Sequence, residues 1–180
     1  MCSSDLPFVR LAEQNGITPV FPPLEPGGDY WDLSFLRKAF QLASQRRTLE
    51  FGANLHIAVS AQSFNRPIDW GNGGEGKWRM PRPYAKPEIG EQDHFGLNTY
   101  QWYAQIAKKT LNSTPKIFML YMGAANIQNN KMDETLDYDK LLDLVIEDED
   151  SSQETIAIAE NVIGCLFWLI NTPKKREKQD

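Results

Sequence analysis

Residues 54–78, NLHIAVSAQSFNRPIDWGNGGEGKW, decide the fold of this chain. The stretch begins with an apolar run at residues 55–59, whose length and β-branched side chains predict a buried strand. It continues as a loop rich in Gly, Pro and Asp that also carries Trp70 and Trp78. Proteins of the α/β class place binding groups in such loops, at the carboxyl edge of a parallel sheet. We therefore expect the functional site at this edge.

Further strand and helix patterns alternate on both sides of this stretch. Strands are predicted at residues 17–21, 55–59, 116–122 and 165–170, and helices at residues 7–15, 33–47, 96–111, 133–147 and 156–162. The last two segments stay open, because Gly164 indicates a break whereas Ile156, Ala159, Ile163 and Phe167 fit one continuous helix. Such alternation predicts a parallel sheet with right-handed crossovers. About four βα units would form a partial (β/α)₈ barrel, and the alternative is a small complete doubly wound sheet.

Composition excludes several classes of function. The 180 residues are 41% hydrophobic and 24% charged, which indicates one globular domain and not a disordered chain. The net charge is -5, and the only basic run lies in the tail, so nucleic acid is not an expected partner. No stretch is apolar over a length that could span a bilayer. The glycines of residues 71–76 lack the Lys-Ser/Thr ending of a phosphate loop, and we expect no cofactor.

Metal-ligating and disulfide patterns are also not evident. His56 and His94 are the two histidines, and neither has a carboxylate at ligand spacing, so no metal site is expected. Cys2 and Cys165 do not make a disulfide framework, and Cys165 lies in an apolar run typical of a core thiol.

The two ends of the chain differ in character from the middle. Residues 1–6, MCSSDL, match a translated sequencing-adapter end, which predicts that they are not part of the biological sequence. The rival interpretation is a lipoprotein end with an acylated Cys2 and a short polar tether. We therefore expect the domain at residues 7–172 and a solvated charged tail at residues 173–180.

The strand ends resemble those of a known family, the retaining glycosidases built on (β/α)₈ barrels, over the carboxyl-terminal half of the barrel. In this resemblance the fifth, sixth, seventh and eighth strands correspond to residues 17–26, 59–64, 117–123 and 165–170, with Trp168 on the eighth. The family's histidine at the end of the sixth strand falls near Ala61 or Gln62, so Gln62 is a candidate for substrate contact. The resemblance implies a carbohydrate as the ligand.

The catalytic residues of that family are not evident here. A retaining glycosidase needs two carboxyl groups about 5 Å apart, one as nucleophile and one as acid/base. Tyr121 occupies the nucleophile position, two residues before Gly123. The dipeptide Glu25-Pro26 matches the family's acid signature only in a register that leaves one strand too few. Glu25 and Tyr121 are therefore the catalytic candidates, and we expect the intact pair to be missing.

Aromatic residues in the loop are the candidates for sugar binding. Trp70 and Trp78 lie among polar residues and glycines, where their faces could stack on sugar rings, although both could instead pin the loop. Asp69 could accept hydrogen bonds from sugar hydroxyls, but Asp-Trp-Gly is also ordinary turn sequence. We expect the other aromatic residues, Trp31, Tyr100, Trp102 and Tyr103, to pack in the core, and Asp32 to cap a helix.

These patterns predict a glycosidase-like barrel fragment that binds carbohydrate at its top face and lacks an intact catalytic pair. The alternative is a non-enzymatic module that binds carbohydrate or a partner protein. A third possibility is a small doubly wound domain that binds another small molecule at its switch point. A partial barrel leaves unpaired strand edges, so we also expect self-association through them.

Overall fold

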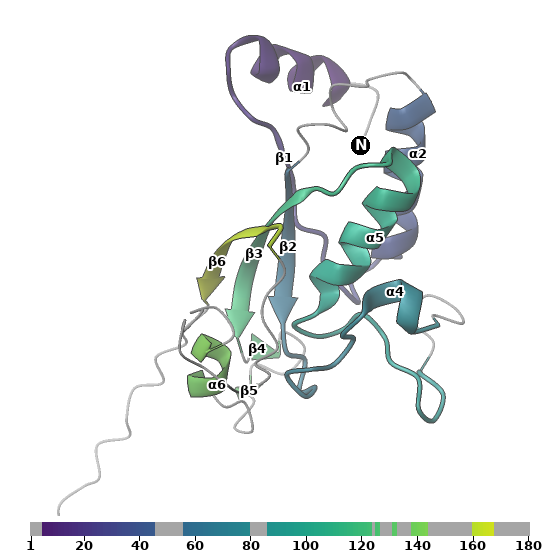
Figure 1. Cartoon of the computed structure of the whole chain (residues 1–180), viewed down its shortest axis with the longest axis vertical. Coiled ribbons are helices and arrows are strands. Elements are labelled where there is room, and N and C mark those ends of the chain that lie inside the picture. The colour runs from purple at the N-terminus through teal and green to yellow at the C-terminus, as the bar shows by residue number, and fades with distance from the viewer. Residues whose placement is uncertain are drawn as a thin grey trace, which may run out of the picture.

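A four-stranded parallel sheet organises the computed structural model. The structure describes residues 5–45, 56–79, 86–123, 125–126, 131–132, 138–143 and 160–167. The strands lie in the order β1 (Val20–Phe21), β2 (His56–Gln62), β3 (Lys116–Gly123) and β6 (Val162–Phe167). Every neighbouring pair is parallel, so all carboxyl ends share one edge, the lower edge in Figure 1. The α/β class and the parallel sheet predicted from the alternating pattern are therefore confirmed.

The order of these strands follows the order of the sequence without reversal. A doubly wound sheet reverses its strand order at the switch point where it binds ligands, and the described strands contain no such reversal. Sequential order occurs in consecutive units of a barrel and also within one half of a doubly wound sheet. The sheet is thus compatible with either arrangement as a part.

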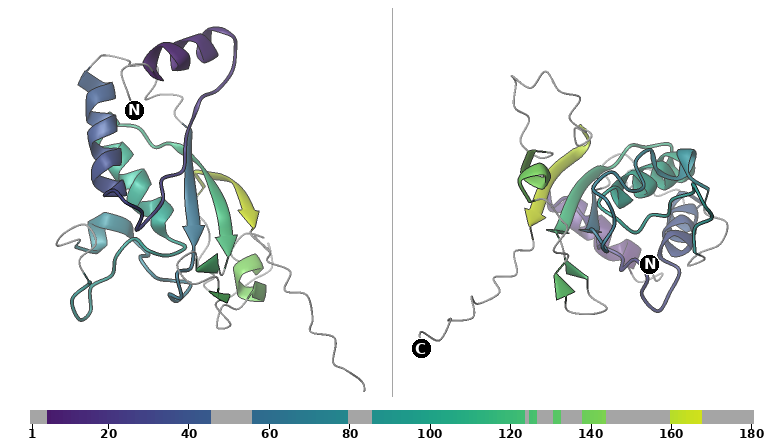
Figure 2. Two further views of the ribbon diagram at one scale, coloured as in Figure 1. Left: turned by 180° about the vertical axis from the view of Figure 1, so that it is seen from behind. Right: turned by 90° about the horizontal axis from the view of Figure 1, so that it is seen from below.

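Two long helices pack on the sheet. These are α2 (Asp32–Gln45) and α5 (Thr99–Leu111), which contact each other, and α5 also contacts β2. Their shared core contains the fully buried Leu36, Phe40, Tyr103 and Ile106. Both views of Figure 2 show α2 and α5 together on one side, with β6 on the far side. The third helix, α1 (Asp5–Gln14), lies beyond the amino ends of the strands, at the top of Figure 1.

Strand β2 is buried on both faces. Ile57, Val59 and Ala61 alternate along it and belong to the hydrophobic core. The opposite face carries smaller or polar side chains, among them Ser60 and Gln62, which are also buried. Burial on both faces is typical of a central strand in a parallel sheet, and it explains the nearly continuous apolar run in the sequence.

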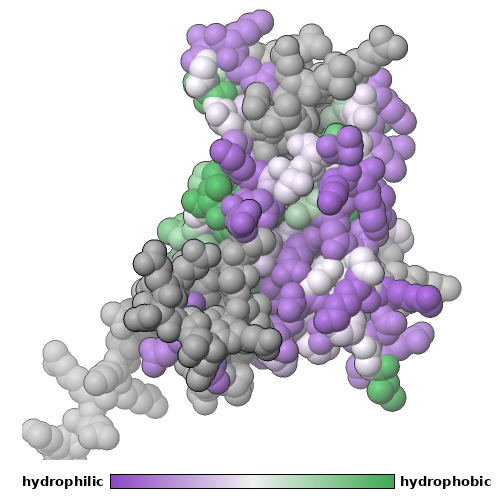
Figure 3. Space-filling model, viewed as in Figure 1, coloured by the Kyte–Doolittle hydropathy of each residue, from purple (hydrophilic) through white to green (hydrophobic). Residues whose placement is uncertain are grey.

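Strand β6 is only half covered. Cys165 and Phe167 pack against the core, whereas Ile163 and Leu166 are 43% and 57% exposed. A green hydrophobic area appears in Figure 3 at the left margin, where Figure 1 places β6. This exposed apolar surface is the kind of edge at which self-association was expected, and that expectation stays a prediction.

Gly164 corrects the sequence-based assignment at this end of the chain. It lies inside β6, so the strand begins at Val162 and not at Cys165, and residues 162–167 are not helical. A Cβ atom at Gly164 would lie 3.1 Å from the Phe118 ring on β3. The glycine therefore allows two neighbouring strands to approach and does not break the strand.

The remaining predicted elements are confirmed to different extents. Helix α2 and strand β3 lie within two residues of their predicted bounds, and α5 begins three residues later than predicted. Of the helix expected at residues 133–147, the structure describes α6 (Tyr138–Asp143), and the rest lies outside the described residues. The helix expected at residues 156–162 and Trp168 also fall largely or wholly outside them. The short pair β4 (Ala125–Asn126) and β5 (Lys131–Met132) was not predicted.

Cys165 provides a test of how β6 is packed. Burial raises the pKa of its thiol, so less of the reactive thiolate is present at a given pH. In a Cys2→Ser variant, we expect slow reaction with a disulfide reagent at pH 8, accelerating as the pH is raised. The same variant in denaturant should react at the rate of an unhindered thiol. Equal rates in the folded and unfolded protein would contradict this packing.

Candidate functional site

The loop that follows β2 turns sharply at the carboxyl edge of the sheet. Phe64 and Asn65 both adopt left-handed backbone conformations, with φ values of 50° and 58°. Just before them, the backbone N–H of Ser63 donates to the carbonyl of Gly123 at the end of β3, at 3.0 Å. The start of the loop is thus fixed to the carboxyl end of β3.

Helix α5 holds the middle of this loop, including the short helix α4 (Gly74–Lys77). The side-chain oxygens of Gln101 and Gln105 accept hydrogen bonds from the backbone N–H groups of Gly73 and Gly76. Gly74 has a φ of 64°, and a Cβ atom there would lie 3.0 Å from the backbone of Gln101. Only glycine allows this close approach without strain, so the loop and the helix form one unit.

Trp70 is held in place by a buried carboxylate. Its indole N–H donates to Asp93 Oδ1 at 2.8 Å, and the Arg66 guanidinium donates to Asp93 Oδ2 at 3.1 Å. The guanidinium also lies over the Trp70 ring, 4.4 Å from its centroid. The backbone N–H of Phe95 supplies a third donor to Asp93, which is buried. Asp93 therefore joins both ends of the long loop and fixes the indole orientation.

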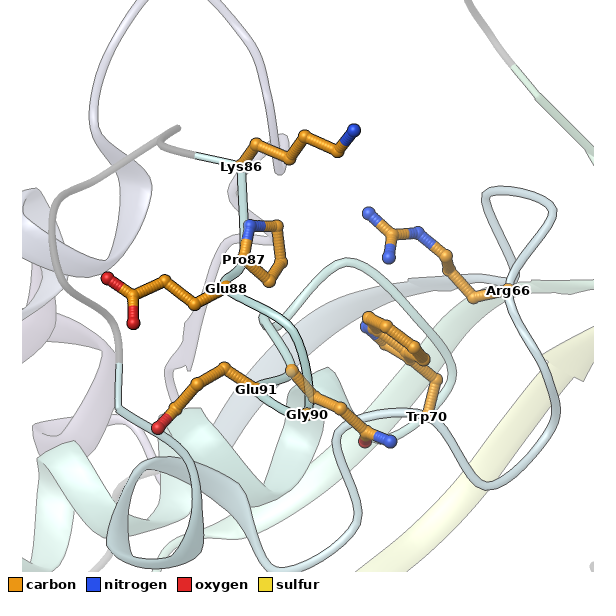
Figure 4. A pocket seen from close by; sticks show the side chains of 8 residues that line it. Arg66, Trp70, Lys86, Pro87, Glu88, Gly90 and Glu91 are labelled. Atoms are coloured by element: carbon orange, nitrogen blue, oxygen red, sulfur yellow. The ribbon is translucent and has the colours of Figure 1, made fainter.

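A cavity of about 300 Å³ opens beside this cluster (Figure 4). Its lining comes from two segments of the loop and consists of Arg66, Trp70, Lys86, Pro87, Glu88, Gly90, Glu91 and Gln92. Its size is at the lower end of the range of small-molecule sites, roughly 300–1,000 Å³.

Backbone N–H donors fix the wall of the cavity that Glu91 and Gln92 form. The backbone N–H of Gly71 donates to Gln92 Oε1 at 2.6 Å, and that of Arg79 donates to Glu91 Oε2 at 2.9 Å. Each of these bonds joins the segment around residue 91 to the segment between residues 71 and 79. Hydrogen bonds within the loop itself therefore hold this wall.

The predicted sugar-binding residues of the loop lie in different environments. Trp70 lines the cavity, whereas Asp69 is exposed and is not part of the lining. Trp78 also lies outside the lining; its indole N–H donates to the Asn72 carbonyl at 2.6 Å, and its ring packs against the core. The structure thus gives Trp78 a role in pinning the loop.

The other candidates lie at the same edge of the sheet but not in the cavity lining. Gln62 is buried at the end of β2, and Glu25 is exposed in the turn after β1. Tyr121, 36% exposed, has a φ of 56° where the pairing of β2 with β3 shifts register. Such bulges re-aim a side chain and are common near binding sites. The structure does not bring these three residues together with Trp70.

A buried polar cluster was missed by the sequence reasoning. His94 Nε2 lies 3.1 and 3.0 Å from the two carboxylate oxygens of Asp32, and the Tyr103 hydroxyl donates to Oδ2 at 3.2 Å. The exposed fractions of Asp32, His94 and Tyr103 are 1%, 2% and 0%. A substrate could not reach these groups, so the cluster holds α2 to α5 and to the segment before it. Capping alone does not account for Asp32.

His94 Nδ1 has no hydrogen-bond partner among the residues that the structure describes, and the ring packs beside Phe95 and Trp102. No spacing in the sequence could indicate this cluster, because its members lie 62 and 71 residues apart.

The prediction that four aromatic residues pack in the core is confirmed for three of them. Tyr100, Trp102 and Tyr103 are buried as predicted, whereas Trp31 is 60% exposed.

Within the described part of the chain, no three His, Cys, Asp or Glu side chains gather as they would around a metal ion. No helix within those ranges has the length and apolar character needed to cross a membrane. No family model, curated protein or solved structure matches this chain.

Proposed function

We propose that this chain binds carbohydrate in the cavity beside Trp70, as a glycosidase-like α/β protein that does not hydrolyse its ligand. The observation that supports this most is a fixed indole forming one wall of a cavity at the carboxyl edge of a parallel sheet. Ligand sites in open and closed parallel sheets lie at that edge.

The chemistry of the lining suits a hydroxylated ring. An aromatic side chain offers an apolar surface for sugar C–H groups, and Trp70 is held rigidly enough to do so with little loss of side-chain entropy. Arg66 and the side-chain amide of Gln92 supply hydrogen-bond donors to sugar hydroxyl groups. In ligand pockets, polar groups of this kind fix the orientation of the ligand and provide specificity.

Hydrolysis is not part of the proposal, because the lining does not supply two free carboxyl groups of the required kind. Asp93 accepts bonds from Trp70, Arg66 and Phe95, so it is committed to structure. Glu91 accepts a backbone N–H, and Glu25 and Tyr121 lie outside the lining. A retaining mechanism needs two carboxyl groups about 5 Å apart acting on one bond.

We also propose that the sheet is part of a (β/α)₈ barrel. Sequential parallel strands with a long loop after β2 are compatible with consecutive (β/α) units, and they support the glycosidase-like interpretation. The fold class alone does not imply a function.

Titration of the purified chain with oligosaccharides tests the proposed function. The panel holds trimers of glucuronic, galacturonic and mannuronic acid, each beside its carboxyl-reduced neutral counterpart. We expect at least one trimer to bind in calorimetry, and Trp70→Leu to weaken that binding about tenfold because the stacking surface is lost. Nitrophenyl glycosides of the same sugars should not release nitrophenol.

Trp31→Leu is the matched control, since Trp31 is exposed and does not line the cavity. It should leave the dissociation constant unchanged. Binding of no trimer, or equal affinity of the Trp70→Leu and parental chains, would refute the proposed function.

A further inference from the structure

We propose that the sugar bound in this cavity carries a carboxylate, as a uronic acid does, and that Arg66 and Lys86 bind that carboxylate together. This inference depends on the proposed function, because it names the chemical class of the carbohydrate. It is carried by the arrangement of charges around the cavity.

The lining carries charges of both signs, but they are not mixed. Arg66 and Lys86 are its cations, and Glu88 and Glu91 are its anions. Figure 4 shows the cationic ends of Arg66 and Lys86 extending toward the same side of the cavity, whereas the carboxylates of Glu88 and Glu91 point away from them. The lining is therefore neutral in sum yet positive on one side, and a ligand anion is favoured there.

Arg66 is prepared to bind a carboxylate. One of its terminal nitrogens is engaged by Asp93 at 3.1 Å, which leaves further N–H donors of the planar guanidinium for a ligand. Contact with the Trp70 ring holds the guanidinium in a defined orientation. A guanidinium fixed in this way matches the two oxygens of a carboxylate better than a flexible ammonium does.

Lys86 supplies a second positive charge to the cavity. Asp93 pairs with Arg66 and does not neutralise this charge. Its side chain is exposed, and no ion pair joins it to any residue in the described ranges. Of the two carboxylates in the lining, that of Glu91 accepts the Arg79 backbone N–H, and that of Glu88 points away from Lys86 (Figure 4). Lys86 is therefore available to an incoming anion.

The indole distinguishes a sugar acid from a simple anion. Trp70 lies directly beside Arg66, so a ligand that meets the guanidinium with its carboxylate can place its ring on the aromatic wall. Phosphate or acetate has no ring to use this surface. The volume of about 300 Å³ suits a unit as small as one sugar residue.

The same trimers test the inference, because each uronide and its carboxyl-reduced counterpart differ only at C6. We expect the uronide to bind about tenfold more tightly, since charge-assisted bonds to a carboxylate replace bonds to a hydroxyl. That advantage should shrink as sodium chloride is raised, because the site is open to solvent. Lys86→Gln should remove most of it while leaving the affinity for the neutral trimer unchanged.

Lys38→Gln is the matched control, because it removes the same charge from an exposed position on α2 outside the lining. It should keep the preference for the uronide. Equal binding of the two trimers, or a preference that survives Lys86→Gln, would overturn the inference while leaving the proposed function intact. Inorganic phosphate binding as tightly as the uronide would also overturn it. Failure of every trimer would instead remove the proposed function itself.

Discussion

Replacing Asp32 with alanine is expected to lower the free energy of unfolding by about 3–5 kcal/mol. The Asp32 carboxylate bonds to His94 Nε2 and to the Tyr103 hydroxyl, and all three residues are almost completely buried. Alanine would leave both partners without their acceptor in a place that water does not reach. Chemical denaturation followed by tryptophan fluorescence measures the change, with an unchanged slope if the unfolded state is unaffected.

Two variants separate this effect from a general loss of charge. Asp29→Ala removes an exposed carboxylate near the start of the same helix and should change the stability by less than about 0.5 kcal/mol. Tyr103→Phe removes the hydrogen bond from the tyrosine hydroxyl to Asp32 and should cost about 1 kcal/mol. If Asp32→Ala and Asp29→Ala were equally stable, the buried cluster would not hold the two helices together.

Replacing Asp93 with alanine is expected to abolish carbohydrate binding and to cost about 2 kcal/mol of stability. The side chain receives hydrogen bonds from Trp70, Arg66 and the backbone of Phe95. Without it, the Trp70 indole and the Arg66 guanidinium are no longer held in place in the cavity lining. The stability cost is modest because the Arg66 side chain is 30% exposed and water can replace part of the bond. Calorimetric titration with the trimer of highest affinity and chemical denaturation measure the two effects.

Asp93→Asn provides the graded comparison. Its amide oxygen can still accept the Trp70 indole N–H, but it no longer carries the charge that faces Arg66. We expect this variant to retain the fold and to bind more weakly than the parent. Asp139→Ala, on the exposed surface of α6, should bind like the parent. Normal binding by Asp93→Ala would show that the fixed indole is not needed.

The sheet could be predicted from the sequence because its signals are local. A short apolar run between turn residues indicates a strand wherever that strand is finally placed, and the strand–helix alternation implies parallel neighbours. Closure of the sheet depends on strands that pair at long range, so the pattern is equally compatible with part of a barrel or part of a doubly wound sheet. The role of Gly164 could not be predicted in this way. The glycine is needed because the Phe118 ring lies close to it, and Phe118 is on another strand.

The site could be predicted only at the level of its loop. The polar residues and glycines around Trp70 predicted that its ring is available to a ligand, and Trp70 lies in the cavity lining. Arg66, Lys86 and Asp93 were not identified, because charged loop residues are ordinarily solvated and nothing local distinguishes a paired one. Trp31 was expected in the core since large aromatic residues usually pack there, yet its place in an exposed turn leaves it 60% accessible.

The two glutamine side chains of α5 that bind the loop backbone have a consequence for the thermodynamics of recognition. Gln101 and Gln105 satisfy loop N–H groups through intramolecular hydrogen bonds, so α5 itself holds the loop segment around α4. A sugar that enters would not have to freeze that segment, and the entropic penalty of association would fall mainly on the ligand's own torsions. Affinity in this protein should therefore rise most with stiffer saccharides.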